Sequence, residues 1–427
     1  MPASDSLRSE LLTCFDTALT AVRPGPALAG ALDPEPLPAE APHILAVGKA
    51  AVPMTRAAAA WLGARDLRPA SSLVVAPSIE PIRGIPVIAG DHPLPGFRSA
   101  AAADSIASFC RATPPGATVW FLLSGGATSL MAGPEARLTI DDLQRSYDLL
   151  LRSGLDIRAM NLVRKRLSRW GGGKLALALA HTTIAQFTIS DVVGDPLDAI
   201  GSGPMVADSG SAAEAVALIE QAGLRQLLPG SAMERLDDLA AGRIPDLPAP
   251  DVPELTRVRA TIVASNRTAV EAVVELARER GWAIEADPEP MTGEAAENGT
   301  RLAERLLEGE PRLIIAGGET TVHVREATGQ GGRNQELALA AARVLGKSKM
   351  PVALLAAGTD GRDGPTDAAG GLVDHTTWRR IKAAGVDPAA ALESHDAYRA
   401  LAASGDLLHT GPTGTNVMDL VIAAREA

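Results

Sequence analysis

Residues 119–129, Val-Trp-Phe-Leu-Leu-Ser-Gly-Gly-Ala-Thr-Ser, carry the clearest fold signal in the chain. The apolar run 119–123 predicts a buried strand, and the two glycines that follow the serine predict a sharp turn. A strand that breaks through glycines into a helix exposes backbone N–H groups beside the hydroxyl of Thr128, which makes a good phosphate cradle. The alternative is a tight strand-to-helix turn capped by Ser and Thr. The local sequence favours neither.

The same succession of strand, polar glycine-rich turn and helix recurs along the chain. A strand at 43–47 ends in a turn that holds Lys49, and a strand at 183–189 runs into a loop that holds Asp191 and Asp195. Repeated alternation of this kind indicates an α/β fold with largely parallel sheets flanked by helices. Ligands gather at the carboxyl ends of such strands, where these polar turns fall. Further strands are expected at 72–76, 86–88, 259–264, 312–316, 320–324, 352–356 and 417–423.

The helices and the length of the chain indicate two domains. At 427 residues the chain is too long for one ordinary core. The Pro- and Asp-rich stretch 242–253 is the expected boundary, and 23–42 is expected to be a loop. Asn334 is placed to cap a helix. The other helices are predicted at 6–22, 51–62, 140–153, 157–170, 211–222, 232–241, 266–280, 294–307, 376–384 and 388–403.

Composition excludes several classes of function. The net charge of −11 argues against a nucleic-acid partner, so an anionic substrate must be met by a local basic cluster. The two cysteines, Cys14 and Cys110, fit a reducing cytosol as buried thiols, although one disulfide remains open. The seven histidines lack zinc spacing. Neither a secretory core nor a run of eighteen apolar residues is present, so the expectation is a cytoplasmic protein without membrane contact.

Three familiar nucleotide or nucleophile motifs fail on inspection. Gly173-Lys174 lacks the earlier glycine and the following Ser or Thr of a phosphate-binding P-loop. The pair Gly201 and Gly203 is followed by Val206 where a dinucleotide fingerprint needs glycine. Ser124 precedes two glycines instead of lying between them as in a hydrolase elbow. The failed dinucleotide motif weakens a nicotinamide-dependent function.

Acidic residues gather in two of the polar loops. Asp191 and Asp195 are read either as loop-stabilising caps or as groups that activate a hydroxyl or hold Mg²⁺. Asp360, Asp363 and Asp367 lie within one Gly- and Pro-rich segment, which is either a turn-rich surface loop or a Mg²⁺ or substrate loop. The calcium-loop order of acids is missing there.

Basic and imidazole groups receive plainer interpretations. The basic side of the helix at 157–170 is expected to be a solvated face, and two histidines are expected to be ordinary polar residues. The residues concerned are Arg158, Arg164, Lys165, Arg166 and Arg169, together with His92 and His323.

The stretch 316–336 joins acid, hydroxyl, arginine and amide groups to five glycines. Gly317 and Gly318 end a predicted strand where the backbone can approach a ligand, and Glu319 follows them. Three more glycines precede Arg333. So many polar groups beside so many glycines favour a binding loop over a purely structural segment.

Seven of these motifs in this order identify a family. The chain resembles the glycerate 2-kinase family, whose C-terminal part is called the MOFRL domain, over nearly its whole length. Each motif is weak alone, and the ordered set is highly specific. The motifs are Val47-Gly48-Lys49-Ala50, Leu123-Ser124-Gly125-Gly126-Ala127-Thr128-Ser129, Ser190-Asp191-Val192-Val193-Gly194-Asp195, Gly317-Gly318-Glu319-Thr320-Thr321-Val322, Gly332-Arg333-Asn334-Gln335-Glu336, Gly358-Thr359-Asp360-Gly361 and Gly411-Pro412-Thr413-Gly414-Thr415-Asn416.

The resemblance implies a transferase that phosphorylates D-glycerate to 2-phospho-D-glycerate with ATP and Mg²⁺. It implies a Rossmann-like α/β domain at 1–250, a MOFRL-type α/β domain at 251–427, and an active site in the cleft between them. A monomer or a homodimer is expected. Members of the family are often labelled hydroxypyruvate reductase, so an NAD(P)H-dependent reductase of hydroxypyruvate or the tartronate pathway is the alternative, which the missing dinucleotide fingerprint disfavours.

The resemblance also suggests roles for individual residues. Lys49, Asp191 and Arg333 are the catalytic candidates, with Asp191 as the proton acceptor and Asp195 as its possible substitute. Candidates for substrate or phosphate binding are Ser124, Gly125, Gly126, Ala127, Thr128 and Asn266. Candidates for nucleotide binding are Gly317, Gly318, Glu319, Thr320, Asn334, Asp360, Gly361, Thr413 and Asn416. Candidates for Mg²⁺ are Asp195, Glu319 and Asp367.

Overall fold

The computed structural model describes residues 3–35, 40–308, 312–324 and 329–426 and divides the chain into two compact units. Unit 1 comprises Met1–Arg23 and Ala264–Ala427, and unit 2 comprises Pro24–Val263. The observed division differs from the expected boundary at 250/251. It falls later because the strand at 259–264 joins the sheet of unit 2, and the first helix belongs to unit 1.

Unit 2 is built on a six-stranded sheet in the order β3-β2-β1-β4-β5-β6. The pairs from β3 through to β5 are all parallel, as expected. Consequently the carboxyl ends of β1, β4 and β5 lie side by side along one edge. The strands are β1 His43–Val47, β2 Ser71–Ala76, β3 Val87–Ala89, β4 Thr118–Leu123, β5 Thr183–Ile189 and β6 Arg259–Ala264.

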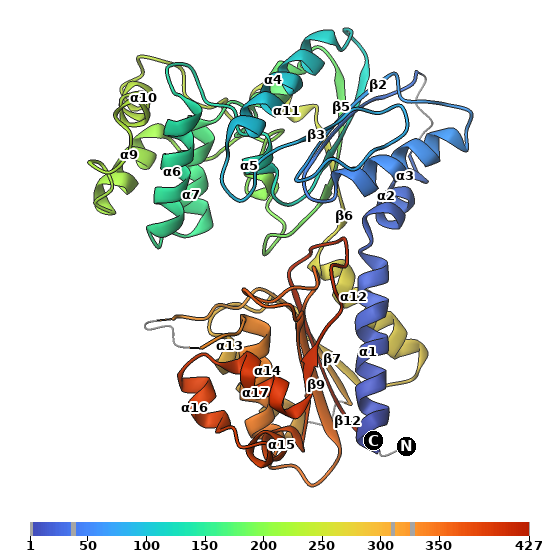
Figure 1. Ribbon diagram of the computed structural model, residues 1–427. Coiled ribbons are helices and arrows are strands. Elements are labelled where there is room, and N and C mark those ends of the chain that lie inside the picture. The colour runs from blue at the N-terminus through green and yellow to red at the C-terminus, as the bar shows by residue number, and fades with distance from the viewer. Residues whose placement is uncertain (1–2, 36–39, 309–311, 325–328, 427) are drawn as a thin grey trace. The chain divides into compact units, whose positions relative to one another are not determined.

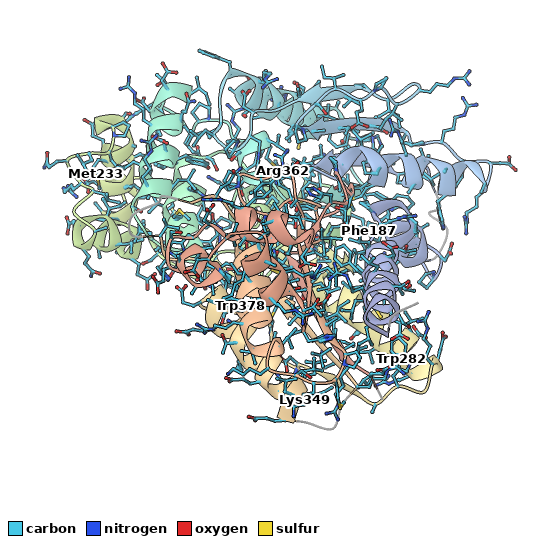
Figure 2. All side chains as sticks on the ribbon, turned by 60° about the horizontal axis from the view of Figure 1, so that its bottom comes forward. Phe187, Met233, Trp282, Lys349, Arg362 and Trp378 are labelled. Atoms are coloured by element: carbon cyan, nitrogen blue, oxygen red, sulfur yellow. The ribbon has the colours of Figure 1, made fainter. Side chains whose placement is uncertain are left out.

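Helices cover both faces of this sheet because the strand residues are apolar on both sides. On one face Trp61 of α3 packs edge-to-face on Trp120 of β4. Trp120 meets Phe187 of β5 in the same way; Phe187 is labelled in Figure 2. On the other face α4 and α8 bury their apolar sides against β1 and β4. The helices are α2 Pro24–Leu32, α3 Ala51–Gly63, α4 Phe97–Ala112, α5 Ala127–Leu130, α8 Lys174–Ala178, the 3₁₀ turn η1 Ile200–Ser202 and α11 Pro253–Thr256.

Four further helices of unit 2 form a separate apolar cluster beside the sheet (Figure 1). Leu143, Tyr147, Val163 and Leu236 are among its buried members, and Met233 on α10 belongs to it as well (Figure 2). This cluster encloses α7, which carries several basic residues. The helices are α6 Ile140–Arg152, α7 Ile157–Leu167, α9 Ala212–Gln221 and α10 Gly230–Ala240.

Unit 1 is built on a six-stranded sheet in the order β11-β10-β9-β12-β8-β7. Only β7 and β8 are parallel, and the other four pairs are antiparallel. The prediction of a largely parallel sheet is therefore wrong for this unit. The cause is that β12 enters from the opposite end and separates β8 from β9. The strands are β7 Ile284–Ala286, β8 Leu313–Gly318, β9 Val352–Gly358, β10 Gly370–Asp374, β11 Leu407–Leu408 and β12 Asp419–Arg425.

The helices of unit 1 lie on both sides of its sheet (Figure 1). On one side α13, α14 and α17 bury their apolar faces, and Trp378 of α15 packs at the margin of the same core (Figure 2). On the other side lie α1 and α12. The helices are α1 Ala3–Ala21, α12 Asn266–Glu279, α13 Ala295–Glu308, α14 Arg333–Leu345, α15 Thr377–Ala383, α16 Pro388–Glu393 and α17 Ala397–Ser404.

Helix α1 belongs to unit 1 although it precedes unit 2 in the chain. Leu7, Leu11 and Phe15 recur at helical spacing and are buried, because α1 packs on α12, β9 and β12. Arg8 donates to two buried carboxylates, those of Asp374 and Asp406, at 2.9 Å each. The helix is thus bound to the C-terminal part of the chain by apolar burial and by ion pairs.

Several local expectations need correction. The stretch 24–32 forms helix α2, although 23–42 was expected to be a loop; residues 36–39 lie outside the described part. The expected strand at 320–324, fully described, is reduced to one bridge between Thr321 and Glu294. The expected helix at 388–403 is two helices, because His395 adopts a left-handed φ of 55° between them. Helix α4 and strand β10 were not expected.

Both cysteines are free and buried, as favoured, and they lie in different units. Burial raises the pKa of Cys14 to about 11 and that of Cys110 to about 12. Across the described ranges, no helix combines the length and the apolar character needed to cross a membrane.

Candidate functional site

The turns after β1 and β4 of unit 2 are locked together by short-range contacts. Ser124 Oγ accepts a hydrogen bond from the N–H of Ala50 at 3.0 Å, and the N–H of Lys49 donates to the carbonyl of Gly125 at 2.9 Å. Gly48 has φ of 133° and lies so close to Ser124 that a Cβ there would clash with the serine hydroxyl and backbone. Glycine is therefore required at position 48, where the turn after β1 meets Ser124. The turn presents Lys49 and the start of α5 on the same edge of the sheet.

Asp191 lies in the loop that follows β5, the strand beside β4, at the same edge of the sheet. Its carboxylate lies against Gly125, where any side chain would clash with Oδ2. Burial raises the pKa of Asp191 above its ordinary value, and the nearby positive charge of Lys49 opposes that shift. A carboxylate with a raised pKa is a better proton acceptor than an exposed one. Asp191 therefore has the surroundings expected of a general base.

Lys49 and His92 flank the same glycine turn. A Cβ at Gly126 would lie 3.4 Å from Lys49 Cγ and 3.1 Å from His92 Cδ2. Burial lowers the pKa of His92, and the charge of Lys49 lowers it further. His92 is thus a neutral imidazole beside the ammonium group. It was expected to be an ordinary polar residue, and only its closeness to Gly126 in space places it here.

A hydroxyl chain supports the far side of this turn. The hydroxyl of Thr128 contacts that of Ser202 at 3.0 Å, and Ser202 donates to Asn161 of α7 at 3.4 Å. Ser202 has a left-handed φ of 63°, between Gly201 and Gly203 with φ of 58° and 57°. The expected site residue Thr128 is therefore held by groups that sequence reasoning did not single out.

Asp195 lies further along the loop after β5, also with a left-handed φ of 54°. Its Oδ1 is fully buried and has no hydrogen-bond partner among the described residues. Most buried polar atoms in native proteins are paired, so an orphaned carboxylate oxygen is a candidate ligand for a cation.

Unit 1 has its own polar cluster, centred on Arg333 at the start of α14. Arg333 donates to both oxygens of Asp419, from Nε at 2.5 Å and from Nη2 at 3.0 Å. Its Nη1 pairs with Glu319 at 2.7 Å. Burial by itself lowers the pKa of Arg333, but the hydrogen bonds and charge of Asp419, with the charge of Glu319, raise it overall. The guanidinium is therefore permanently charged and held in a fixed orientation.

Asp419 was missed because it begins an antiparallel strand. In the register of the sheet it lies opposite Gly318 of β8 and Gly358 of β9, so the first residue of β12 shares an edge with the last residues of its neighbours. Polar groups gather at the carboxyl ends of parallel strands, whereas an antiparallel strand brings its first residue to that edge. The signal in the sequence was the acid directly before an apolar run.

Asp363 caps helix α14 in the role that was expected of Asn334. Its carboxylate accepts the backbone N–H of Asn334 at 3.1 Å and of Gln335 at 2.9 Å. The helix N-cap is Gly332, where a side chain would clash with this carboxylate. Burial raises the pKa of Asp363 to about 6, although the N–H bonds from Gln335 and Asn334 lower it. The acid therefore fixes the helix that carries Arg333.

The loops after β9 and before β12 pack on each other and hold the remaining nucleotide candidates. Thr413 donates to the carbonyl of Thr359 at 2.5 Å, and Asp360 accepts from the N–H of Arg362 at 3.0 Å. Gly361, with φ of 83°, touches the backbone of Gly411. The side chain of Asn416 accepts from the N–H of Met418 at 3.1 Å. These polar groups form one loop pair within unit 1.

Asn266 and the two glycines after β8 have close structural contacts. The Asn266 amide donates to the carbonyls of Val417 and Asp419 at 2.9 and 2.8 Å, so both of its N–H groups are engaged. Gly317 lies against the Asn266 carbonyl oxygen, and Gly318, with φ of 146°, lies against the backbone of Met291. Asn266 thereby positions the start of β12, and with it Asp419. Thr320 is buried, and its hydroxyl has no partner among the described residues.

Within unit 1, the two predicted metal ligands Glu319 and Asp367 have different partners. Asp367 accepts from the hydroxyl of Tyr398 at 2.8 Å on the surface of unit 1, whereas Glu319 pairs with Arg333. Within the described ranges, no group of three or more His, Cys, Asp or Glu side chains is arranged to hold a metal. A cation bound here needs most of its ligands from substrate phosphates and water, which is usual for Mg²⁺.

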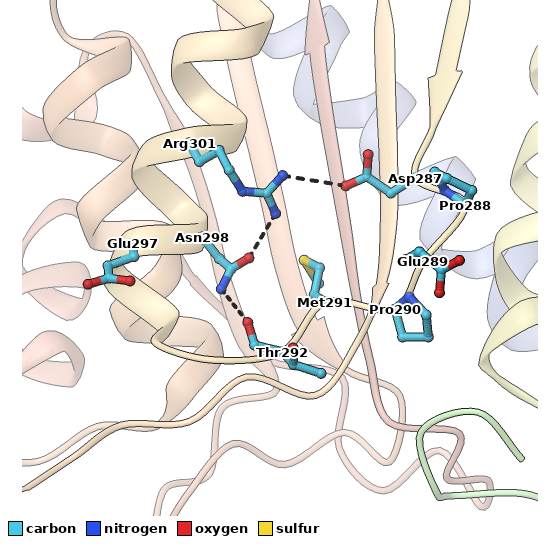
Figure 3. A pocket seen from close by; sticks show the side chains of 9 residues that line it. All are labelled: Asp287, Pro288, Glu289, Pro290, Met291, Thr292, Glu297, Asn298 and Arg301. Carbon is cyan, nitrogen blue, oxygen red and sulfur yellow. Dashed lines mark hydrogen bonds and ion pairs between the residues drawn. The ribbon is translucent and has the colours of Figure 1, made fainter. Parts of the chain in front are cut away.

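A cavity of about 490 Å³ lies beside Met291 in unit 1 (Figure 3). Asn298 donates to the carbonyl of Thr292 at 2.9 Å and accepts from Arg301, which also pairs with Asp287 at 4.0 Å. Glu289 and Glu297 complete the wall. With its one arginine engaged and three acids around it, this cavity is poorly suited to phosphate.

The basic side of α7 is not a solvated face, as was expected. Arg164, Lys165 and Arg166 are 6%, 3% and 0% exposed. Arg158 alone among the helix's basic residues is exposed, while Arg169 just beyond the helix pairs with Asp104 at 2.7 Å. The correction follows from the cluster of α6, α9 and α10, which covers α7 on several sides.

The glycine turn, the lysine and the buried acid at one sheet edge are candidate groups for anion binding and proton transfer. Two family patterns match the chain: the domain of unknown function DUF4147 over residues 10–237, and the MOFRL family over residues 312–419. The first spans more than half of the chain.

Relatives extend this match over nearly the whole length. A glycerate 2-kinase of Pyrococcus horikoshii is 36% identical over 89% of this chain and 86% of its own. A putative hydroxypyruvate reductase of Agrobacterium vitis is 36% identical over 97% and 94%. The crystal structure of glycerate kinase from Thermotoga maritima superposes with a TM-score of 0.88 at 34% identity, covering 99% of this chain and 100% of that one. The chain belongs to the glycerate 2-kinase family with a MOFRL domain.

Proposed function

We propose that this protein is a glycerate 2-kinase, which transfers the γ-phosphoryl group of ATP to the 2-hydroxyl of D-glycerate. The observation that carries the proposal is the edge of unit 2 where Lys49, the Ser124–Thr128 turn and the buried Asp191 converge. Family membership and the likeness to glycerate kinases support the same reaction. The substrates are a small hydroxy acid and a nucleotide, and the protein acts in the cytoplasm.

Asp191 takes the proton of the 2-hydroxyl in this proposal. The hydroxyl oxygen attacks the γ-phosphorus, the bond to the departing ADP breaks, and the proton moves to the Asp191 carboxylate. Burial raises the pKa of Asp191, which favours proton acceptance, while the positive charge of Lys49 opposes that rise and favours the ionised carboxylate. Neutral His92 leaves the positive charge of Lys49 as the local counterion for the transferred group.

Mg²⁺ bound to the nucleotide phosphates supplies neutralisation of their negative charge. The orphaned oxygen of Asp195 fits a role as one protein ligand of that ion. Two residues of unit 1, Glu319 and Asp367, remain further candidates. The nucleotide candidates of the same unit are the paired loops that hold Asp360, Thr413 and Asn416.

Arg333 is the proposed catalytic cation of unit 1, and its charge suits a phosphoryl group. A guanidinium held in the plane of Asp419 presents a fixed charge, and fixed charges stabilise a transition state without reorganisation. Asp419 therefore acts as a positioning residue for Arg333, and Asn266 positions Asp419 in turn.

The reductase alternative is not supported. The turn after β1 contains Gly48 alone, and the following residues, Lys49 to Val52, include no further glycine for a dinucleotide pyrophosphate. The name of the Agrobacterium relative describes that protein and does not supply the missing turn here.

Phosphorus NMR of the product tests the function directly. Incubation of the protein with D-glycerate, ATP and Mg²⁺ is expected to give the resonance of 2-phosphoglycerate and stoichiometric ADP. A 3-phosphoglycerate resonance, or NADH consumption with hydroxypyruvate in place of ADP formation, would refute the proposal.

A further inference from the structure

Helix α7 buries three consecutive cations, and two of them are neutralised. Lys165 Nζ pairs with Asp208 at 3.1 Å. Arg166 pairs with Asp208 at 3.3 Å and Asp246 at 2.9 Å, and donates to the carbonyl of Gly210 at 2.6 Å. Both charges are therefore accounted for within unit 2.

The third cation, Arg164, has no counterion among the residues that the structure describes. It is 6% exposed, yet no residue in the described ranges forms an ion pair or a hydrogen bond with its side chain. Its guanidinium carbon lies 4.9 Å from the ring centroid of Tyr147, and burial lowers its pKa. Arginine stays protonated in proteins, so this is a buried and uncompensated positive charge.

The guanidinium has one enclosed side and one open side. Nε is fully buried without a partner. The two terminal nitrogens also lack acceptors within the described part of the chain, but they are not among the fully buried atoms, so they reach the surface. Stacking on Tyr147 fixes the plane of the group. The free edge is a fork of two donors in one plane, which matches the two oxygens of a carboxylate.

The position of Arg164 on α7 connects it with the candidate site. Asn161 precedes it by three residues, so the two side chains are neighbours on the helix surface. Asn161 bonds Ser202, and Ser202 bonds Thr128 of the glycine turn. In the fold, α7 packs on η1 and η1 packs on α5. The unpaired charge thus lies on the part of α7 that supports the Ser124–Thr128 turn.

We propose that Arg164 binds an oxyanion of the substrates, and that this oxyanion is the carboxylate of the hydroxy acid. The inference rests on the proposed function for the identity of the ligand. A single planar fork with one positive charge suits a carboxylate better than a polyphosphate, whose charge is larger and shared with Mg²⁺. Arg164 then holds the acid while Asp191 acts on its hydroxyl.

Steady-state kinetics of Arg164→Lys and Arg164→Met test the assignment. The KM for D-glycerate is expected to rise about 10- to 150-fold in Arg164→Met, because a hydrogen bond to a charged group is lost. Arg164→Lys keeps the charge without the fork of two donors. Its KM for D-glycerate is expected to lie between that of the unaltered protein and that of Arg164→Met. The KM for ATP should stay within about twofold. The matched control is Arg158→Met, an exposed arginine on the same helix, which should change neither constant.

Two outcomes of the kinetics would overturn the proposal. One is an unchanged KM for both substrates. The other is a selective rise in the KM for ATP, which would assign the guanidinium to a phosphate and not to the carboxylate. Calorimetric titration with D-glycerate and no nucleotide separates this inference from the reaction itself. Glycerate should bind the unaltered protein and fail to bind Arg164→Met, whether or not 2-phosphoglycerate is formed.

Thermal unfolding distinguishes ligand binding by Arg164 from a purely structural role of this residue. Because Arg164 is unpaired, Arg164→Met should raise the Tm, whereas Arg166→Met should lower it by breaking the pairs with Asp208 and Asp246. A fall in Tm for Arg164→Met comparable to that of Arg166→Met would show that Arg164 stabilises the fold, and would overturn the proposal.

Discussion

The two units differ in whether the cations of their candidate sites are paired with acids. In unit 2, Lys49 is exposed and, among the residues described, forms no ion pair, and the buried Arg164 is equally unpaired. In unit 1, Arg333 is bound by Asp419 through two hydrogen bonds and by Glu319 through a third contact. Unit 2 is therefore electrostatically prepared for an anion, whereas unit 1 presents a positive charge that its own acids have already oriented. The comparison predicts that substitutions in unit 2 remove chemistry or substrate binding, and that substitutions around Arg333 weaken charge placement.

The largest effect is expected from Asp191→Asn. Loss of the proton acceptor should lower kcat about 10²- to 10⁴-fold with little change in the KM for D-glycerate. Asp195→Asn is the matched variant from the same loop, and it should instead raise the Mg²⁺ concentration needed for half-maximal rate. A greater loss of kcat in Asp195→Asn than in Asp191→Asn would exchange the two roles.

The next largest effect is expected from Gly125→Ala. The added methyl group would clash with the Asp191 carboxylate and displace it, so kcat should fall on the order of 100-fold while the protein stays folded. Gly63→Ala serves as the control, since no atom lies within 4 Å of a Cβ at that position. Circular dichroism checks the fold of both variants. Normal turnover in Gly125→Ala would show that Asp191 need not lie against this turn.

A smaller effect is expected when Arg333 loses the Asp419 carboxylate that orients it. Asp419→Asn removes the charged partner but keeps the side-chain shape, and kcat/KM should fall about 10- to 100-fold. Arg333→Ala should remove most of the turnover by itself. In the double variant, Asp419→Asn should add nothing to Arg333→Ala. Additive losses would mean that Asp419 acts independently of Arg333. The contrast between an acid-oriented cation in unit 1 and unpaired cations in unit 2 would then not hold.

The smallest effect is a pH dependence of stability that comes from Asp363. Burial raises its pKa to about 6 from an ordinary 3.8, so between these pH values the folded state binds more protons than the unfolded state. The free energy of unfolding should therefore decrease as pH rises through this window, by up to about 3 kcal/mol from this group.

Denaturant unfolding at pH 4.5 and pH 7 measures this slope. Asp363→Asn should flatten the contribution, because asparagine does not titrate and keeps one acceptor for the helix N–H groups. Asp148→Asn, on the exposed side of α6, should leave the slope as it is. An equal slope in Asp363→Asn and in the unaltered protein would contradict the assignment.

The parallel half of the fold could be predicted from the sequence more fully than the antiparallel half. The bounds of β1, β5 and β6 agree with the expected strands residue for residue, because each is rich in β-branched and apolar residues and ends at a polar turn. Strand β10 escaped notice because it begins with Gly370 and Gly371, which read as a turn. A side chain at Gly370 would clash with the carbonyl of Ala356 on the neighbouring strand, so the glycine serves close pairing.

The candidate site shows the same division. Lys49, Ser124 and Asp191 were found from their places after three strands, and the structure brings these turns to one edge. Asp419 and Arg164 were not found as site residues. The position of Asp419 depends on strand direction, which single-sequence patterns do not encode. Whether Arg164 is paired depends on whether an acid lies nearby in space. Lys165 and Arg166, its neighbours in sequence, do have such acids.

Helix α1 has a consequence for how the chain is made. It emerges from the ribosome before the whole of unit 2, whereas its partner α12 follows unit 2 and its partners β9 and β12 are synthesised later still. At about 5–20 residues per second, roughly 20–80 s separate Leu11 from the β12 residues it packs near. Unit 2 is contiguous and can complete its core during that interval, while the part of α1 that packs on β9 and β12 stays uncovered. Slow synthesis should therefore make the first helix the segment most in need of a chaperone.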